Sequence, residues 1–277
     1  MDKTSLGDRM KDYEACTQGT LLRRTPVIIR VDGKAFHTFT KRNLEVGVDP
    51  FNHMMHKTMV GTMQAMMQNM QNAVFGYTQS DEISILLRDW DKHETQQWFG
   101  GKIQKIVSVS AAMATGYFNF LFQPGYSGVN ARVKWVGDVP LFDSRVFQVP
   151  MEEVTNYFVW RQQDATRNSV QMLGRHYMSH GDMNGQNVSN VQDMLMSRYG
   201  VNWNAIDTWK KRGTCVVPNP DSFDSSSAWF QDEEIPIFTK DRSYVEDRLI
   251  GVDHERMNNM REASDILEKR IKNEQTI

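Results

Sequence analysis

The chain has 277 residues, enough to bury one sizeable core, and its 40% hydrophobic and 24% charged residues are typical of a globular protein rather than a disordered one. The formal net charge of −2 argues against a protein that binds nucleic acid through overall positive charge. The sequence has no bilayer-length apolar stretch and no secretory signal, and Cys16 and Cys215 make no disulfide framework, so we expect a cytoplasmic protein without a membrane partner.

The first predicted elements are a short strand and a long helix. Residues 27–31 form a β-branched run between Pro26 and the Asp32-Gly33 pair, which is typical of a buried strand that ends in a turn. A helical pattern extends from about residue 52 to residue 72. Its methionines recur at intervals of three and four residues, which predicts one buried helix face made of Met55, Met59, Met63, Met66 and Met70.

A hairpin and a second long helix follow along the chain. Two apolar runs at 73–77 and 83–87 flank a polar break at 78–80, a pattern that predicts two antiparallel strands joined by a tight turn. Residues 93–122 are rich in alanine, isoleucine, valine and aromatic residues, and they are expected to form one helix that ends before Pro124.

The order of these elements predicts the fold class. Residues 125–137 are expected to form a loop or an insertion, and residues 145–149 a fourth strand. The order β-α-β-β-α-β is that of a ferredoxin-like α+β fold with helices on the sheet. We expect residues 1–150 to form this domain, and residues 151–277 to form a mainly helical region that packs on it without being an independent domain. Its last part, 245–275, is dense in charge and predicts an exposed helix.

Two acidic positions stand out within this pattern. Asp32 follows the first strand, and Asp81 with Glu82 lies in the break between the hairpin strands. The first and third strands of this fold pair with each other, which brings Asp32 and Asp81 close together. Two such carboxylates repel each other unless a cation lies between them, and their hard oxygen atoms favour Mg²⁺. Polymerase-like sites hold two metal ions in this way, although aspartate is also common in ordinary turns.

The sequence motifs around these acids resemble those of a known family. Residues 30–40 read RVDGKAFHTFT and resemble the RxDGxxFHxFT signature of the tRNA-histidine guanylyltransferase family. Residues 77–84, YTQSDEIS, resemble its YxQSDExS signature. Shorter matches follow at 142–145 (FDSR), 160–164 (WRQQD) and 211–214 (KRGT). A single match of this kind is weak evidence, whereas five in the family's order, over about two-thirds of the chain, are specific.

The resemblance implies a polymerase-like palm and a metal-dependent nucleotidyltransferase that adds nucleotides to the 5′ end of tRNA in the 3′–5′ direction. In this family, ATP or GTP activates a 5′-monophosphorylated tRNA, and the 3′-hydroxyl of an incoming nucleotide then attacks the activated phosphate. By match, two Mg²⁺ ions would be held by Asp32, by the carbonyl oxygen of Gly33 and by Asp81, with Glu82 as a supporting or orienting group. The resemblance also implies a homotetramer.

Further roles are implied for individual motif residues. Nucleotide binding is expected from Asp32, Gly33, Lys34, Ala35, Phe36, His37, Ser80 and Asp81. Lys105 matches a family lysine near the activating nucleotide, and Arg145 would neutralise phosphate charge. Contacts to tRNA, or a part in its activation, are expected of Arg30, Asn168, Lys211 and Arg212.

One segment departs from the family pattern. After the WRQxD element, family members that extend tRNA-histidine read HINNLYN, whereas residues 166–172 read TRNSVQM and keep only the first asparagine, Asn168. This departure favours the guanylyltransferase-like branch of the family, which repairs truncated tRNA 5′ ends by templated addition. Addition of the extra 5′ guanylate to tRNA-histidine is the alternative within the family.

Two alternatives from other classes also follow from the fold. Nucleotide cyclases use a related palm and paired acids, but the FHxFT and QSDE motifs argue against a cyclase. A non-catalytic RNA-binding module is the other, and retention of Asp32, Asp81 and Glu82 argues against it because buried unpaired acids are costly. Trp203 and Trp209 are candidates for stacking on RNA bases, with core packing as their alternative role.

Overall fold

A computed structural model describes residues 5–43, 50–122, 139–219 and 228–250. The predictions for 125–137 and for most of 245–275 therefore lie outside the described residues. Within the described ranges, no helix combines the length and the apolar character that crossing a membrane requires.

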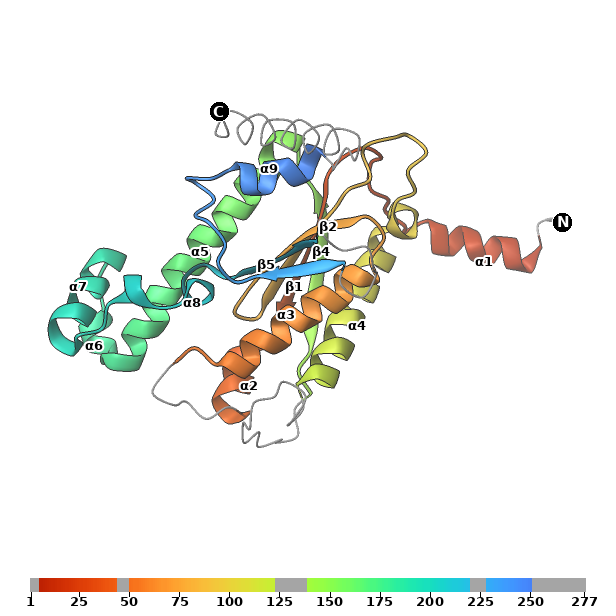
Figure 1. Ribbon diagram of the computed structural model, residues 1–277. Helices are drawn as coiled ribbons and strands as arrows, with labels where there is room; N and C mark the ends of the chain where they lie inside the picture. Colours follow the sequence, from red (N-terminus) through yellow and green to blue (C-terminus); the bar gives the residue numbers. More distant parts are fainter. Residues whose placement is uncertain (1–4, 44–49, 123–138, 220–227, 251–277) are drawn as a thin grey trace, which may run out of the picture.

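The centre of the described structure is a six-stranded antiparallel sheet with the strand order β4-β1-β3-β2-β5-β6 (Figure 1). Its strands are β1 (Val27–Gly33), β2 (Ala73–Gln79), β3 (Glu82–Leu87), β4 (Phe142–Gln148), β5 (Thr214–Pro218) and β6 (Trp229–Asp232). β1 pairs with β3, as the predicted ferredoxin-like arrangement requires. The predicted α+β class is confirmed.

Helices cover both faces of this sheet. On one face lie α3 (His53–Gln68) and α4 (Ile103–Leu121), side by side in Figure 1, and on the other lies α5 (Met151–Tyr177). Alternate β1 residues point to opposite layers, so Ile29 and Val31 join the core beneath α3 and α4 whereas Ile28 joins the core beneath α5. The predicted methionine face is confirmed, because Met55, Met59, Met63, Met66 and Met70 are all buried.

The remaining helices lie around this layered core. The longer ones are α1 (Leu6–Ala15), α2 (Phe36–Asn43), α7 (Val188–Tyr199) and α9 (Ser243–Ile250). The short ones are η1 (Trp98–Gly101), α6 (His180–Met183), η2 (Trp203–Ala205) and α8 (Thr208–Arg212). α6, α7 and α8 gather at one end of α5, and α1 projects from the opposite side of the molecule (Figure 1).

The helix boundaries differ from the predicted ones for local reasons. The side chain of Asn52 accepts a hydrogen bond from the amide of Met55 and so begins α3, which ends at Gln68 rather than near residue 72. The helix predicted from residue 93 begins only at Ile103. Phe99 has a φ of 52° and Gly100 a φ of 62°, and these left-handed conformations interrupt the helix before α4.

The strands also differ from the predictions. β1 and β4 extend further than expected, so Asp32 and Asp143 lie inside strands rather than in the adjoining turns. The chain after residue 150 is not only helical, because β5 pairs with β2 and β6 pairs with β5. Residues from both halves of the chain thus build one sheet.

Candidate active site

The acidic residues meet at one end of the three central strands. Asp32 on β1 lies directly opposite Glu82 on β3, and on its other side it lies opposite Asp143 on β4. Residues opposite each other in antiparallel strands project from the same face, so these three side chains share the face that α5 covers. The amide of Gly33 donates a hydrogen bond to the carbonyl oxygen of Asp81 (3.0 Å), which fixes the β2–β3 turn beside the end of β1.

The turn holds Asp81 in a partly buried position. Ser80, with a φ of 57°, adopts the left-handed conformation that reverses the chain, and its hydroxyl donates to Oδ1 of Asp81 (3.0 Å). Burial raises the pKa of the Asp81 carboxyl, and the nearby charge of Asp32 adds to this effect, although the Ser80 hydrogen bond opposes it. Asp32 is therefore close enough to disfavour the charged form of Asp81.

Arginines surround the acids on the same face. A guanidinium nitrogen of Arg145 lies 4.0 Å from Oδ2 of Asp32 and 3.6 Å from Oδ1 of Asp143. Arg161 on α5 contacts both oxygens of Glu82, through Nε at 2.7 Å and through a terminal nitrogen at 2.9 Å. Burial raises the pKa of Glu82, and Arg161 and Arg30 act against that shift. Arg145, for which the family resemblance implies a role in neutralising phosphate charge, thus lies beside Asp32 and Asp143.

The chain turns sharply after β1 to begin α2. The amide of Lys34 donates to the carbonyl oxygen of Leu141 (2.8 Å), and Ala35 adopts a φ of 56°. The ring of Phe36 packs directly on Gly33, where a side chain would collide with it. These constraints place the first turn of α2 beside the acids, with His37 exposed and Phe36 buried.

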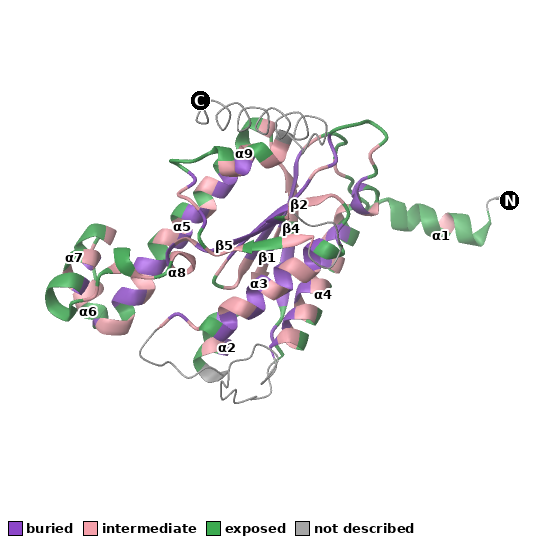
Figure 2. Ribbon diagram, viewed as in Figure 1, coloured by how far each residue is buried: buried purple, intermediate pink, exposed green. Residues whose placement is uncertain are grey.

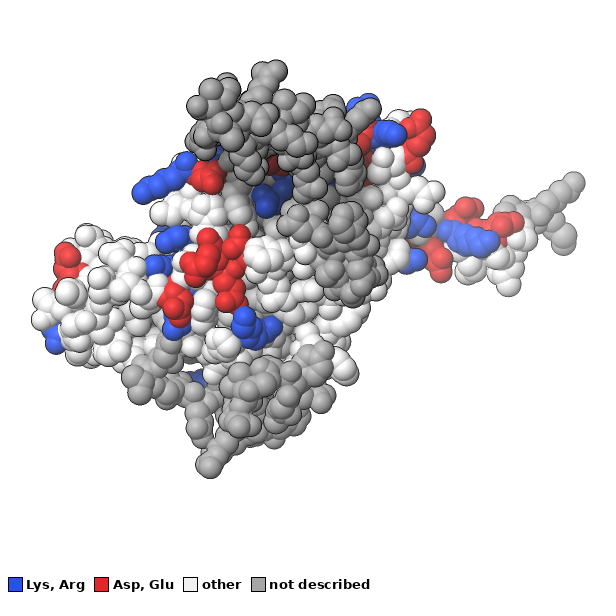
Figure 3. Space-filling view, viewed as in Figure 1, with Lys and Arg blue, Asp and Glu red and all other residues white. Residues whose placement is uncertain are grey.

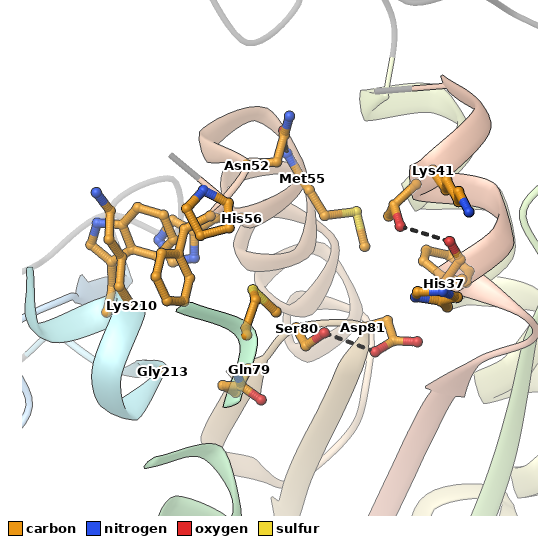
Figure 4. Close-up of a pocket in the computed structure, with 16 residues that line it drawn as sticks. His37, Lys41, Asn52, Met55, His56, Gln79, Ser80, Asp81, Lys210 and Gly213 are labelled. Carbon is orange, nitrogen blue, oxygen red and sulfur yellow. Dashed lines mark hydrogen bonds between the residues drawn. The ribbon is translucent and has the colours of Figure 1, made fainter. Parts of the chain in front are cut away.

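A cavity of about 530 Å³ opens beside Asp81. Its lining comes from four parts of the chain that are distant in sequence: α2, the start of α3, the β2–β3 turn, and α5 with α8. In Figure 4, His37 and Lys41 lie on the same side of the cavity as Asp81, and His56 and Lys210 lie on the other. The predicted nucleotide-binding residues Phe36, His37, Ser80 and Asp81 all line it.

The far side of the cavity is aromatic. Trp209 on α8 stacks on His56 of α3, with ring centroids 4.1 Å apart and an interplanar angle of 16°. Nε2 of His56 lies 3.0 Å from Oε1 of Glu233, and Lys57 lies 2.6 Å from the same oxygen. Burial lowers the pKa of His56 from 6.5 to about 4, so at neutral pH its imidazole is uncharged.

The donor set fits a hard divalent cation better than a zinc ion. No cluster of three or more histidine, cysteine, aspartate or glutamate side chains in the described parts of the chain is arranged to hold a metal. Asp32 and Asp81 would supply two carboxylates, and the backbone of Gly33 would supply a carbonyl oxygen. Mg²⁺ is held in this way by one or two carboxylates, with waters and substrate phosphates completing its shell. A cation here would also relieve the unfavourable burial of the Asp81 charge.

Several predicted site residues lie elsewhere. Lys105 is in the first turn of α4, with its ammonium 4.7 Å from the ring centroid of Phe99. The hydroxyl of Thr115, ten residues further along α4, accepts a hydrogen bond from the amide of Phe142. Phe142 on β4 lies opposite Gly33 at the end of β1. An α-helix rises 1.5 Å per residue, so Lys105 lies about 15 Å along α4 from Thr115, which is the part of the helix next to the end of β1. Within one chain the structure therefore does not bring Lys105 to the acids.

The residues expected to contact tRNA are also dispersed. Lys211 is only 7% exposed, and its ammonium donates to the carbonyl oxygen of Asn204 (2.8 Å), so it is turned into the protein. Arg212 donates to the carbonyl oxygen of Ile235. Asn168 is exposed on α5, and Arg30 lies under the acids near Glu82.

Sequence reasoning missed three features of the site. It assigned no role to Asp143 or Arg161, although both lie within quoted motifs, at FDSR and WRQQD. The pairing of Arg161 with Glu82 spans 79 residues, and a motif match alone does not reveal such a contact. The third feature is the stacking of Trp209 on His56, because residue type made Trp209 a candidate for stacking on RNA bases or for core packing but gave no sign of His56 as its partner.

Fold and site together define a palm-type nucleotidyltransferase, with paired acids at the strand ends of an antiparallel sheet. Comparison with known proteins specifies the family. Residues 7–150 match the family model of tRNAHis guanylyltransferase. The chain belongs to the tRNAHis guanylyltransferase family.

Individual relatives agree with this assignment. The tRNA(His) guanylyltransferase of Debaryomyces hansenii is 28% identical over 221 residues, covering 75% of this chain and 78% of its own. A bacterial tRNA(His) guanylyltransferase-like protein solved in complex with ATP is 41% identical, with a TM-score of 0.78 over 88% of this chain and 99% of its own. Such a protein in complex with GTP is 38% identical, with a TM-score of 0.71 over 89% of this chain and 99% of its own.

Proposed function

We propose that this protein adds nucleotides to the 5′ end of tRNA in the 3′–5′ direction, and that its substrate is a tRNA with a truncated 5′ end, repaired by templated addition. The observation that carries the proposal is that Asp81 lines a cavity of about 530 Å³ and that Asp32 lies near enough to act on its charge, each within one of the family's two acidic motifs. Membership of the family and the ATP and GTP complexes of similar proteins support it.

The nucleoside triphosphate would lie between the acids and α2. In this proposal Asp32, Asp81 and the carbonyl oxygen of Gly33 hold Mg²⁺, which when bound supplies charge neutralisation for the phosphates. Phe36 and His37, at the start of α2, line the cavity, and the backbone amides of this turn could contact phosphate oxygens there. Arg145, beside Asp32, adds a positive charge for the transferred phosphate.

The residues of this chain would act by position and charge rather than by covalent catalysis. The 3′-hydroxyl of the incoming nucleotide attacks the activated 5′ phosphate of the tRNA, and the activating group leaves as the new phosphodiester forms. Phosphoryl transfer of this kind depends on alignment and on neutralising charge. Glu82, held by Arg161 and directly opposite Asp32, would keep the Asp32 carboxylate oriented.

The choice of a truncated tRNA rests on the segment at residues 166–172. Met172 aligns with the last asparagine of HINNLYN, and it lines the cavity with an apolar side chain. In this proposal, an asparagine that would help to recognise tRNA-histidine is thus replaced by an apolar residue in the cavity wall. On the face shown in Figure 3, Lys and Arg side chains are scattered around a central acidic group, which suits a reaction guided by base pairing rather than by many protein–phosphate contacts.

The proposal includes three further points, of which only the first comes from the family resemblance. We propose a homotetramer, a cytoplasmic location, and a role for residues 151–277 as part of the catalytic unit rather than as an independent domain. The pairing of β5 with β2 supports the last point, because the sheet of the palm continues into this part of the chain.

The test is incubation of 5′-labelled, monophosphorylated tRNAs, either full-length or lacking the 5′ nucleotide, with each nucleoside triphosphate and Mg²⁺. We expect extension of the shortened tRNA by the nucleotide that pairs with its opposite strand. Addition of only guanylate to full-length tRNA-histidine would favour the alternative activity. The absence of extension with every RNA, under conditions in which GTP binding is measurable, would contradict both.

A further inference from the structure

Trp160 on α5 is an exposed aromatic side chain near the acids. It is 50% exposed, whereas every other tryptophan in the described parts of the chain is buried or half-buried. Buried and exposed residues are interspersed along α5 (Figure 2), and Trp160 belongs to the side that meets solvent. Tryptophan is on average a well-buried residue, because leaving its large apolar ring in water is unfavourable. Core packing therefore does not account for Trp160.

The helix directs this ring to the side of the sheet where β4 is the edge strand. Gln162, two residues further along α5, donates to the carbonyl oxygen of Pro236 and accepts from the amide of Phe238. The ring of Phe238 in turn lies beside that of Phe75 on β2, with centroids 6.5 Å apart. Side chains two residues apart on a helix point about 200° apart. Trp160 therefore points away from β2, to the side of β1 and β4.

Two neighbours on α5 hold the ring in place. The ring of Tyr157 lies 5.8 Å from that of Trp160 between centroids, and it also lies 5.6 Å from the ring of Phe147 on β4. The Tyr157 hydroxyl is hydrogen-bonded to Ser84 on β3 (2.8 Å). The guanidinium carbon of Arg161 lies 4.5 Å from the centroid of the Trp160 ring, in a cation–π contact. The structure thus presents a flat apolar ring to solvent in a fixed orientation.

Arg161 also links this ring to the acids. The guanidinium that lies over Trp160 contacts both oxygens of Glu82, and Glu82 lies directly opposite Asp32. Only one guanidinium and one carboxylate therefore separate the ring from Asp32. A group that contacts Trp160 lies within the length of about one nucleotide of the acids, because a nucleotide advances a strand by roughly 3 to 7 Å.

The surface on this side of α5 also carries positive charge. The side chain of Arg145 on β4 is 52% exposed. Arg167 lies seven residues after Trp160, on the same side of α5, and its side chain is 64% exposed. Arginines that contact phosphates, together with an aromatic ring that stacks on a base, are the combination with which proteins bind an RNA strand.

We propose that Trp160 stacks on the 5′-terminal nucleobase of the tRNA and so positions the 5′ phosphate at the acids. This inference rests on the proposed function, which places that phosphate beside Asp32 and Asp81. The end of a base-paired stem exposes the flat face of its last base, and the ring covers this face until an incoming nucleotide stacks there. Every base has such a face, so the contact suits an enzyme that repairs different 5′ ends.

Other occupants of the ring fit less well. The residues that line the cavity of about 530 Å³ do not include Trp160, so a nucleoside triphosphate bound in the cavity leaves the ring free. A protein partner needs an interface of about 800 Å² on each side, and a single ring between charged side chains offers far less apolar surface.

Steady-state kinetics with a 5′-monophosphorylated tRNA that lacks its 5′ nucleotide would compare the wild type with Trp160→Leu and Trp160→Phe. Leucine keeps an apolar side chain but removes the ring, so we expect KM for the tRNA to rise about tenfold, with kcat and KM for GTP within about twofold of the wild type. Trp160→Phe should restore most of the affinity. Phe230→Leu, at a position on β6 that is 52% exposed, is the matched control and should leave KM for the tRNA unchanged.

Photocross-linking tests the contact without any catalysis. In one arm, the wild type is irradiated with a tRNA that carries 5-iodouridine at its 5′ end, and no nucleoside triphosphate is present. In the other arm, it is irradiated with 5-iodouridine triphosphate alone. Mass spectrometry then locates the labelled residue. We expect the tRNA arm to label Trp160 and the triphosphate arm to leave it unlabelled.

Three results would overturn the inference. The first is a cross-link to Trp160 in the triphosphate arm only, or none to it in either arm. The second is an unchanged KM for the tRNA in folded Trp160→Leu. The third is a fall in kcat and in unfolding free energy without a change in KM, which would mean that the ring only supports Arg161.

The same experiments separate this inference from the proposed function. A cross-link from the tRNA to Trp160, without 5′ extension of any RNA, would contradict the proposed function and leave the stacking contact standing. Normal 5′ extension by Trp160→Leu, with an unchanged KM for the tRNA, would do the reverse.

Discussion

The amide of Gly33 is hydrogen-bonded to the carbonyl oxygen of Asp81 at 3.0 Å. This bond joins the end of β1 to the β2–β3 turn and so holds the family's two acidic motifs together through the backbone. Asp32 and Asp81 therefore stay close even when their side chains repel each other. A backbone bond of this kind fixes the two motifs relative to each other, which reduces the entropy cost of binding a ligand between them.

We predict that Asp32→Ala and Asp81→Ala each abolish nucleotide addition by orders of magnitude, because each removes a proposed metal ligand. Both variants should fold normally by circular dichroism, since neither side chain belongs to a hydrophobic core. Chelation of divalent ions should stop the wild type, and added Mg²⁺ should restore it. Full 5′ extension by either variant would exclude the metal site proposed here.

Arg161 is expected to act on activity through Glu82. The two side chains are only 12% and 18% exposed, so Arg161→Ala leaves Glu82 with a buried charge and should cost about 3 kcal/mol of unfolding free energy. It should also lower kcat more than it raises KM, because Glu82 no longer orients Asp32.

The double variant Arg161→Met with Glu82→Gln is the matched control for that experiment. It removes both charges and should recover most of the stability, as measured by urea denaturation, without recovering kcat. Recovery of kcat together with stability would mean that the pair has only a structural role.

We predict that the protein prefers tRNA lacking a 5′ nucleotide over intact tRNA-histidine. The reason is that residues 166–172 replace the family's HINNLYN motif, whereas the two acidic motifs are intact. One of the replaced positions, Met172, lines the cavity. Competition between the two RNAs at limiting enzyme is the measurement. A preference for intact tRNA-histidine that depends on its anticodon would reverse the assignment.

His56 should make the fold sensitive to acid. Burial lowers its pKa from 6.5 to about 4, so between these values the unfolded chain binds a proton that the native chain does not. Stability should therefore fall as the pH drops from about 6.5 to about 4, by about 2 to 3 kcal/mol for this residue. In His56→Gln this part of the pH dependence should disappear.

The matched control for this prediction is the exposed His180 on α6. His180→Gln should unfold in urea with the same pH dependence as the wild type. An equal pH dependence in His56→Gln and the wild type would show that His56 is protonated in the native state at the same pH as in the unfolded chain.

The sequence alone determined the local features of this protein. Short apolar runs bounded by turn residues located the central strands, and the methionines at helical spacing located the buried face of α3. The two acidic motifs singled out Asp32 and Asp81, because the chemistry of the proposed metal site restricts the residue types that can stand there. Helix boundaries were less predictable, since the left-handed conformation of Phe99 that delays α4 has no clear sequence signal.

Only the tertiary structure decided which distant residues complete the site. Packing of α5 on the sheet places Arg161 beside Glu82, and packing of α8 beside α3 stacks Trp209 on His56. The same packing leaves Lys105 away from the acids and turns Lys211 inward. Sequence patterns report the periodicity of single elements, whereas contacts between elements depend on the angles and distances at which whole helices pack on the sheet.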